Sequence, residues 1–273
     1  MNGSARIDDY PHRTEGDRLW GDIRRDAAAI AAQEPLLASL VQMSVLGHAR
    51  FEQALSYILA QKLHTAETPS VLLRQAFDEM LATSADISGA ARADLAAVCE
   101  RDPACQSPLE ALLFFKGFHA LATHRVAHAL LRQGRRALAL YLQSRMSFAF
   151  GVDINPAAQL GRGIMIDHAT GVVIGETTVI ADGVSLLQGV ALGGTGKEAG
   201  DRHPKVGEGV MIGAGAGIFG NVAIGARAKI GAGSVVLKDV PAGCTAAGVP
   251  AKIVGRCAEQ EPAREMDQSF DAC

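Results

Sequence analysis

Two groups of polar residues interrupt an otherwise aliphatic, glycine-rich C-terminal half of the sequence. The first contains Asp153 and the pair Asp167-His168, and the second is a loop with Arg202 and His203 at its centre. Of the eight histidines, only His168 and His203 lie in this half. An imidazole titrates near neutral pH, so these are the first candidates for proton transfer.

His168 suits a general base that takes the proton of a hydroxyl group as its oxygen attacks a thioester. Such a base needs an orienting partner on its other ring nitrogen, and a carboxylate provides one. Asp153 lies fifteen residues before His168. These positions approach each other across neighbouring turns if the chain winds with eighteen residues a turn. We therefore predict that Asp153 pairs with His168. The alternative is a surface histidine at a corner of the fold.

Other charged residues could hold a small zwitterionic substrate. Arg202 can clamp a carboxylate through two hydrogen bonds, and Asp167 or Asp102 can receive an ammonium group. Together these groups fit an amino acid. The alternative for each residue taken alone is a solvated loop charge, and Asp102 precedes Pro103, where a helix-ending turn is a sufficient structural reason for it.

Aliphatic residues recur at intervals of six through the same half. The series comprises Ile154, Leu160, Ile166, Ile174, Ile180, Leu186, Leu192, Val206, Ile212, Ile218, Ile224, Ile230 and Val236. A period of six matches neither a helix nor a simple strand. It is typical of a chain wound around a triangular prism, with one hexapeptide a face and a small residue at each corner. Coils stack about 4.8 Å apart, and the series predicts roughly four to five of them.

The series is interrupted twice, and the polar groups fall at the interruptions. Two extra residues separate Ile166 from Ile174. The gap from Leu192 to Val206 is fourteen residues, which we interpret as two repeats plus two. A conventional Gly/Ala/Val-rich sheet is an alternative to the prism, as is a prism that serves only as a scaffold.

The N-terminal half has a different period. Apolar residues at spacings of three and four predict a bundle of helices over residues 17–145. The fold class predicted is therefore α+β, with an all-helical domain before a parallel β-helix. We divide the chain into a disordered extension (1–16), a helical domain (17–145), a β-helical domain (146–256) and a flexible tail (257–273).

Composition excludes several classes of protein. The net charge of −3 calls for no nucleic acid or anionic membrane as partner, and no apolar run is long enough to span a bilayer. The N-terminus shows no signal peptide, and the five cysteines are scattered, as free thiols in a reducing compartment would be. These features predict a cytoplasmic protein.

A metal site is not expected. His119, His124 and His128 share a predicted helix, but no carboxylate or cysteine completes a ligand spacing, so we interpret them as packing residues. The β-helical carbonic anhydrases use three histidine ligands, and the repeat half offers two.

Several strings of residues resemble bacterial serine acetyltransferases, within the hexapeptide-repeat acyltransferase superfamily. The most specific are Ile166-Asp167-His168-Ala169-Thr170-Gly171 and Gly200-Asp201-Arg202-His203-Pro204-Lys205. The others lie at 101–103, 116–120, 152–156, 192–197 and 245–252. The resemblance extends from about residue 17 to about residue 270.

The resemblance implies a left-handed β-helix, trimers that pair into a hexamer, and transfer of acetyl from acetyl-CoA to the hydroxyl of L-serine in cysteine biosynthesis. It gives His168 as the base and Asp153 as its partner. It implies that serine is held by Asp102, Asp167, Arg202 and His203. Coenzyme A is expected along the prism, at a subunit interface, near Gly194, Ala214, Ala232 and Lys252, with Lys252 on a phosphate.

The resemblance also implies feedback inhibition by L-cysteine, and we expect direct attack in a ternary complex without an acyl-enzyme. The family tail usually ends in an isoleucine that enters the active site of O-acetylserine sulfhydrylase. This chain ends in Asp271-Ala272-Cys273, which weakens the expectation of that complex. The competing interpretations are an acetyltransferase for homoserine or a sugar, and a scaffold without catalysis. Arg202 and the aspartates argue against a neutral sugar.

Overall fold

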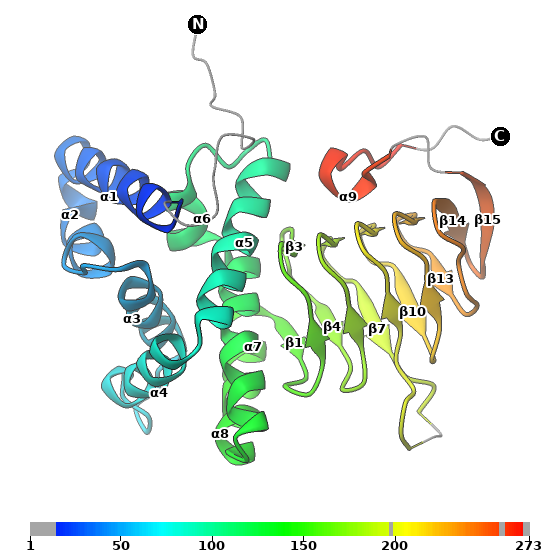
Figure 1. Ribbon diagram of the computed structural model, residues 1–273, viewed down its shortest axis with the longest axis horizontal. Helices are drawn as coiled ribbons and strands as arrows, with labels where there is room; N and C mark the ends of the chain where they lie inside the picture. Colours follow the sequence, from blue (N-terminus) through cyan, green and yellow to red (C-terminus); the bar gives the residue numbers. More distant parts are fainter. Residues whose placement is uncertain (1–14, 197–198, 257–259, 270–273) are drawn as a thin grey trace, which may run out of the picture.

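The computed structural model describes residues 15–196, 199–256 and 260–269. A helical part and a column of stacked coils lie end to end along its longest axis (Figure 1). Of the predicted disordered extension (1–16), residues 1–14 lie outside the described residues. The last two residues belong to the first helix, which begins at Glu15.

The helical part contains eight α-helices and one π-helical segment within the described residues. They are α1 (Glu15–Gln33), α2 (Pro35–Val41), η2 (Gln42–Leu46), α3 (Phe51–Leu63), α4 (Ser70–Thr83), α5 (Ala85–Arg101), α6 (Pro108–Phe114), α7 (Lys116–Arg132) and α8 (Arg136–Phe150). Helix α8 continues past the predicted domain boundary at residues 145 and 146. It ends at Gly151, whose left-handed φ of 67° turns the chain into the column.

The column consists of three sheets, one on each face of a prism. Sheet 1 contains β1 (Val152–Ile154), β4 (Val172–Ile174), β7 (Ala191–Gly193), β10 (Gly217–Phe219) and β13 (Val235–Val236). Sheet 2 contains β2 (Gln159–Leu160), β5 (Val179–Ile180), β8 (Lys205–Val206) and β11 (Ala223–Ile224). Sheet 3 contains β3 (Met165–Ile166), β6 (Ser185–Leu186), β9 (Met211–Ile212), β12 (Lys229–Ile230), β14 (Cys244–Gly248) and β15 (Ala251–Arg256). All neighbours pair in parallel except the final β14–β15 hairpin.

The register confirms the predicted winding and corrects one detail. Ile212 pairs with Ile230, eighteen residues on, as a regular coil requires. Ile154 pairs with Ile174, so the coil that contains His168 holds two extra residues. Ile180 pairs with Val206, 26 residues on. The fourteen residues from Leu192 to Val206 are therefore one ordinary six-residue step to the next face plus eight extra residues. The prediction of two repeats plus two was wrong.

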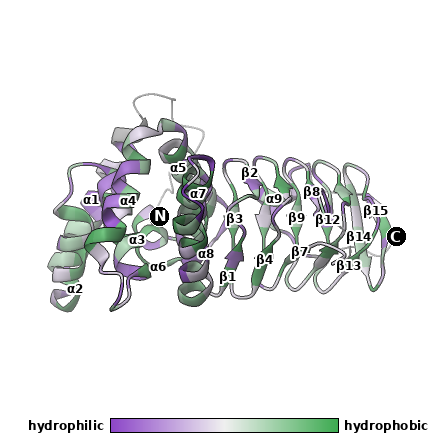
Figure 2. Cartoon of the chain, turned by 90° about the horizontal axis from the view of Figure 1, so that it is seen from below, coloured by the Kyte–Doolittle hydropathy of each residue, from purple (hydrophilic) through white to green (hydrophobic). Residues whose placement is uncertain are grey.

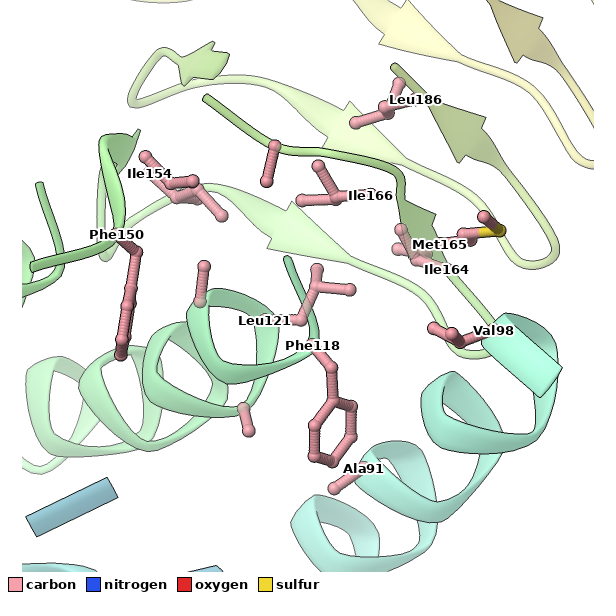
Figure 3. Packing of buried hydrophobic residues seen from close by; sticks show 14 of the residues in the cluster. Ala91, Val98, Phe118, Leu121, Phe150, Ile154, Ile164, Met165, Ile166 and Leu186 are labelled. Carbon is pink, nitrogen blue, oxygen red and sulfur yellow. The ribbon is translucent and has the colours of Figure 1, made fainter. Parts of the chain in front are cut away.

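The aliphatic series forms the interior of the column, and the helical part closes its first end. Ile154, Ile174 and Ile212 are all at most 1% exposed. Figure 2 shows hydrophobic segments on many strands of the stacked coils, interspersed with polar ones. Figure 3 shows Leu121 of α7 directed toward the first coil, where Ile164 and Ile166 lie, while Phe118 points toward Ala91 of α5. The first coil thus has a partner for its open end.

A buried ion pair ties the two parts together. Arg125 of α7 binds the carboxylate of Asp94 of α5 through Nε at 2.7 Å and Nη2 at 2.8 Å. Asp94 also accepts from the backbone nitrogen of Ile164, and Arg125 donates to the carbonyl oxygen of Gly161. Both partners are almost fully buried. Losing either one would leave an uncompensated charge at the joint.

The helical histidines pack as predicted. His119 Nε2 lies 2.8 Å from the carbonyl oxygen of Leu112, and His128 Nδ1 lies 2.8 Å from that of Pro156. Within the described ranges, no group of three or more His, Cys, Asp or Glu side chains is arranged to hold a metal ion. No helix there is both long and apolar enough to cross a bilayer.

Part of the tail is held against the column. Helix α9 (Pro262–Glu265) follows the β14–β15 hairpin, and the carbonyl oxygen of its Ala263 accepts from Ser185 Oγ at 2.7 Å. Lys229 Nζ donates to the carbonyl oxygen of Ser269 at 2.6 Å. The predicted flexible tail (257–273) therefore includes a segment, residues 260–269, that packs along sheet 3. The terminal Cys273 lies outside the described residues, while Cys99, Cys105 and Cys244 are free thiols.

Buried histidines predict a loss of stability below neutral pH. Burial lowers the pKa of both His119 and His124 to about 3. Because the unfolded chain binds these protons near pH 6.5 and the folded chain does not, the free energy of unfolding falls as pH drops. Between pH 7.0 and 5.5 each histidine costs about 1.3 kcal/mol.

Urea unfolding of His124→Gln at these two pH values tests this prediction. Between pH 7.0 and 5.5, the free energy of unfolding should fall by about 1.3 kcal/mol less in the variant than in the parent. The exposed His64 provides the matched control, His64→Gln, which should keep the parent's pH dependence. If the free energy of unfolding of His124→Gln depended on pH as strongly as that of the parent, His124 could not be a buried neutral imidazole in the folded chain.

Candidate active site

The corners of the prism carry the polar residues, and two of its three edges matter here. We define the first edge as the corners between sheets 3 and 1, at residues 167–171, 187–190, 213–216 and 231–234. The second edge comprises the corners between sheets 1 and 2, at residues 155–158, 175–178, 194–204 and 220–222. The two extra residues lie on the first edge and the eight extra residues on the second.

His168 projects from the first corner of the first edge. It and Ala169 have φ values of 53° and 61°, a conformation that residues with side chains rarely adopt. The bend is held by a hydrogen bond from Thr170 N to the carbonyl oxygen of His168 at 2.7 Å, and by one from Gly171 N to that of Gly151 at 2.7 Å. The side chain of His168 is 74% exposed, so a ligand can reach it. Consecutive left-handed residues are a strain typical of functional sites.

Two carboxylates accompany His168. Asp167 Oδ2 lies 3.6 Å from His168 Nε2. Burial raises the pKa of Asp167, His168 opposes that shift, and the charge of Asp102 raises it further. Asp102 follows the end of α5 and accepts from Ala104 N at 2.8 Å. The helical part therefore brings the charge of Asp102 close to the first edge, while its role in holding serine stays a prediction.

Asp153 lies on the coil before His168. Its Cα partner is Val173 on β4, the strand that follows the His168 corner. Its Oδ1 accepts from Gln143 Nε2 of α8 at 2.7 Å. The ion-pair contact of His168 is with Asp167, so pairing of Asp153 with His168 stays a prediction.

Arg202 and His203 lie on the second edge. His203 is 7% exposed, and its Nδ1 is 2.8 Å from Thr177 Oγ1 and accepts from Thr177 N at 3.3 Å. Burial, and then the charge of Arg202, lowers the pKa of His203, which favours the neutral ring. Arg202 Nη2 contacts Glu176 Oε2 at 2.8 Å. A Cβ on Gly175 would stand 1.9 Å from His203 Cδ2, so this residue must be glycine.

The two edges border sheet 1 from opposite sides. One hexapeptide spans that face, a width of roughly 15–20 Å at the rise of a strand. A single chain therefore groups Asp102, Asp167 and His168 on one edge and Arg202 and His203 on the other. An amino acid is too short to contact both groups of one chain at once.

The residues predicted for coenzyme A also divide between the edges. Backbone hydrogen bonds join successive corners of the first edge: Gly189 N donates to Thr170 O, Gly215 N to Gln188 O, and Gly233 N to Ala214 O. Ala214 and exposed Ala232 thus share the edge of His168. Gly194 lies on the second edge, where its Cβ would stand 3.1 Å from Arg202 Cγ. Lys252 is exposed on β15, opposite Ala247, at the far end of the column.

Sequence reasoning missed the polar neighbours that α7 and α8 contribute. Lys116, the first residue of α7, donates from Nζ to Thr170 Oγ1 beside His168. Gln143 was missed altogether, although a polar residue inside an apolar stripe was a usable signal. Ala139, Gln143, Met146 and Phe150 follow the spacing of one helix face, and all but Gln143 are buried and apolar.

This fold and these edges place the protein among the hexapeptide-repeat acyltransferases. The family model "Bacterial transferase hexapeptide (six repeats)" matches residues 203–238, and "Serine acetyltransferase, N-terminal" matches residues 19–123. The serine acetyltransferase of Salmonella typhimurium is 53% identical over 253 residues, 93% of each chain. The chain belongs to the serine acetyltransferase family.

Solved structures agree with this assignment. Serine acetyltransferase from Vibrio cholerae is 54% identical with a TM-score of 0.92, over 93% of this chain and 99% of that one. A serine acetyltransferase in complex with cysteine is 52% identical with a TM-score of 0.92, over 94% and 100% of the chains. The Brucella abortus enzyme in complex with coenzyme A is 49% identical with a TM-score of 0.87, over 88% and 96%.

Because Gly175 packs closely on His203, a larger residue at this position should displace the imidazole. Gly175→Ala should push the imidazole away from Thr177 and lower kcat/KM for the amino-acid substrate at least about tenfold, the effect of one lost polar contact. Steady-state kinetics with acetyl-CoA measures it. Gly21→Ala is the matched control, because a Cβ there meets nothing within 4 Å. Unchanged kcat/KM in Gly175→Ala would show that His203 does not contribute to the site.

Proposed function

We propose that this protein transfers the acetyl group of acetyl-CoA to the hydroxyl of L-serine, giving O-acetylserine and coenzyme A. The observation that carries the proposal is the grouping of His168 with Asp167 and Asp102 on an exposed corner, in a chain of the serine acetyltransferase family. An exposed imidazole beside carboxylates suits an acceptor that carries both a hydroxyl and an ammonium group.

His168 acts as the general base, with Asp153 as its orienting partner. As the serine oxygen adds to the thioester carbonyl, His168 takes its proton. The tetrahedral adduct then expels coenzyme A thiolate, which the imidazolium reprotonates, so the histidine returns to its starting form. Both substrates are bound together, and no acyl-enzyme forms. The proton steps require an accessible ring, and His168 is 74% exposed.

The serine site is shared between two copies of the chain. Asp102 and Asp167 of one copy receive the ammonium group, while Arg202 and His203 of a neighbouring copy hold the carboxylate. Separation of the two edges across sheet 1 supports this arrangement, because the first edge of one column must face the second edge of another. Three copies around an axis bring each edge to a partner, which agrees with a trimer, and trimers pair into a hexamer.

Coenzyme A lies in the groove between these two edges. Ala214 and Ala232 leave room along the edge of His168, Gly194 borders the groove on the second edge, and Lys252 holds a phosphate at the far end. Small side chains let the backbone approach the cofactor closely, and the exposed ammonium of Lys252 complements its charge.

L-cysteine competes for the serine site. It differs from serine by sulfur in place of the hydroxyl oxygen, so the same ammonium and carboxylate contacts serve it, and a related enzyme was solved in complex with cysteine. The place of this reaction is cysteine biosynthesis in the cytoplasm.

Replacing the base tests the chemistry. His168→Ala should lower kcat about 10²- to 10⁴-fold, the contribution of one general base, while leaving the oligomer intact. Release of coenzyme A thiol with serine, homoserine and a galactoside measures both turnover and acceptor choice. Near-normal turnover in His168→Ala, or preference for another acceptor, would overturn the proposal.

Mixed oligomers test the shared site. His168→Ala and Arg202→Ala chains, each nearly inactive alone, should regain about one quarter of the parent activity when co-expressed in equal amounts, because half of the sites receive an intact His168 and half of those an intact Arg202. Activity of the purified mixture, at equal total chain, is the measurement. A mixture as inactive as its components would place the whole site in one chain.

A further inference from the structure

Gln143 is a half-buried polar residue of α8 that lies beside the buried residues Leu142 and Met146. It follows Ala139 by four residues and precedes Met146 by three, and both neighbours are fully buried. Figure 1 shows α8 leading directly into β1 beside the first coil. A polar side chain at such a position lowers stability unless it is hydrogen-bonded. Its partner therefore explains why the position is not apolar.

That partner is Asp153. Gln143 Nε2 donates to Asp153 Oδ1 at 2.7 Å. An ionised carboxylate can only accept, so the amide nitrogen rather than the amide oxygen must face it. Such a charge-assisted hydrogen bond is among the stronger polar contacts in proteins. No other hydrogen bond to the Asp153 carboxylate is recorded among the described residues, so Oδ2 is left for a second donor.

Gln143 is presented by a rigid element. Helix α8 packs along α7, and Arg145 Nε donates to the carbonyl oxygen of Leu63 of α3 at 3.0 Å. At its end, Gly151 turns the chain into β1, and its carbonyl oxygen accepts from Gly171 N at 2.7 Å, in the corner that carries His168. The helix, Asp153 and the His168 corner are therefore joined through one short turn.

We infer that Gln143 is a positioning residue for acetyl transfer, which fixes one oxygen of the Asp153 carboxylate so that the other is directed at His168. This inference rests on the proposed function. A carboxylate held at one oxygen has a single orientation, whereas an unheld one rotates about its terminal torsion. Gln143 does not touch substrate, so its effect falls on turnover rather than on binding.

Gln143→Met tests the inference. Methionine has a similar length and extends the apolar stripe of α8, so the fold should be kept while the donor is lost. We expect kcat to fall about 10- to 100-fold, the range of one hydrogen bond to a charged group. The KM values for serine and acetyl-CoA should stay within about twofold, because the contacts to both substrates remain. Gln133→Met, at an exposed glutamine after α7, is the matched control and should leave all three values unchanged.

A double-variant cycle separates positioning from general damage. If Gln143 acts through Asp153, then Gln143→Met should cost nothing further in an Asp153→Ala background. Parent-like kcat in Gln143→Met overturns the inference. So does an equal loss in both backgrounds, which would mean that Gln143 acts on the site through the fold.

The same assay distinguishes failure of this inference from failure of the proposed function. Parent-like turnover in His168→Ala would refute the base assignment whatever Gln143 does. A large loss in His168→Ala with no loss in Gln143→Met would leave the base in place and refute only the positioning role.

Discussion

The stacking register of the coils is the constraint on which the site depends. Each inward aliphatic residue must lie above another, as Ile212 does with Ile230, so a strand cannot absorb an extra residue without turning its side chains out of the core. Extra residues are tolerated only at corners. The two residues added before β4 and the eight added before β8 therefore lie at corners, each on a particular coil of the stack and on a different edge. Those are the segments that carry His168 and Arg202.

The helical part does more than close the open end of the column. Arg125 and Asp94 join α7 and α5 to the backbone of the first coil, and a Cβ on Gly117 would stand 1.9 Å from the carbonyl oxygen of Ile166. These contacts hold α5 and α7 against the first coil, and Asp102, which follows α5, lies close enough for its charge to raise the pKa of Asp167. The contacts that pack the helical part on the column thus also place Asp102 beside the His168 corner.

Much of this fold follows from the sequence, because a period of six has one compact solution, and the interruptions in the period marked the polar corners. The fourteen-residue gap was misinterpreted because spacing alone cannot tell two extra repeats from one long loop; only strand pairing of Ile180 with Val206 does. Handedness came from the resemblance and not from the spacing. Gln143 was missed because its role depends on a contact with Asp153 across a turn, which periodicity does not reveal.

The division of the site between two copies is the central claim, and a crystal structure of the assembled protein with bound coenzyme A and L-cysteine tests it most directly. The account predicts the amino acid between two columns, with its ammonium group at Asp102 and Asp167 of one chain and its carboxylate at the Arg202 side chain of the next. Ligands contacting a single column, with the first edge of each chain facing solvent, would contradict it.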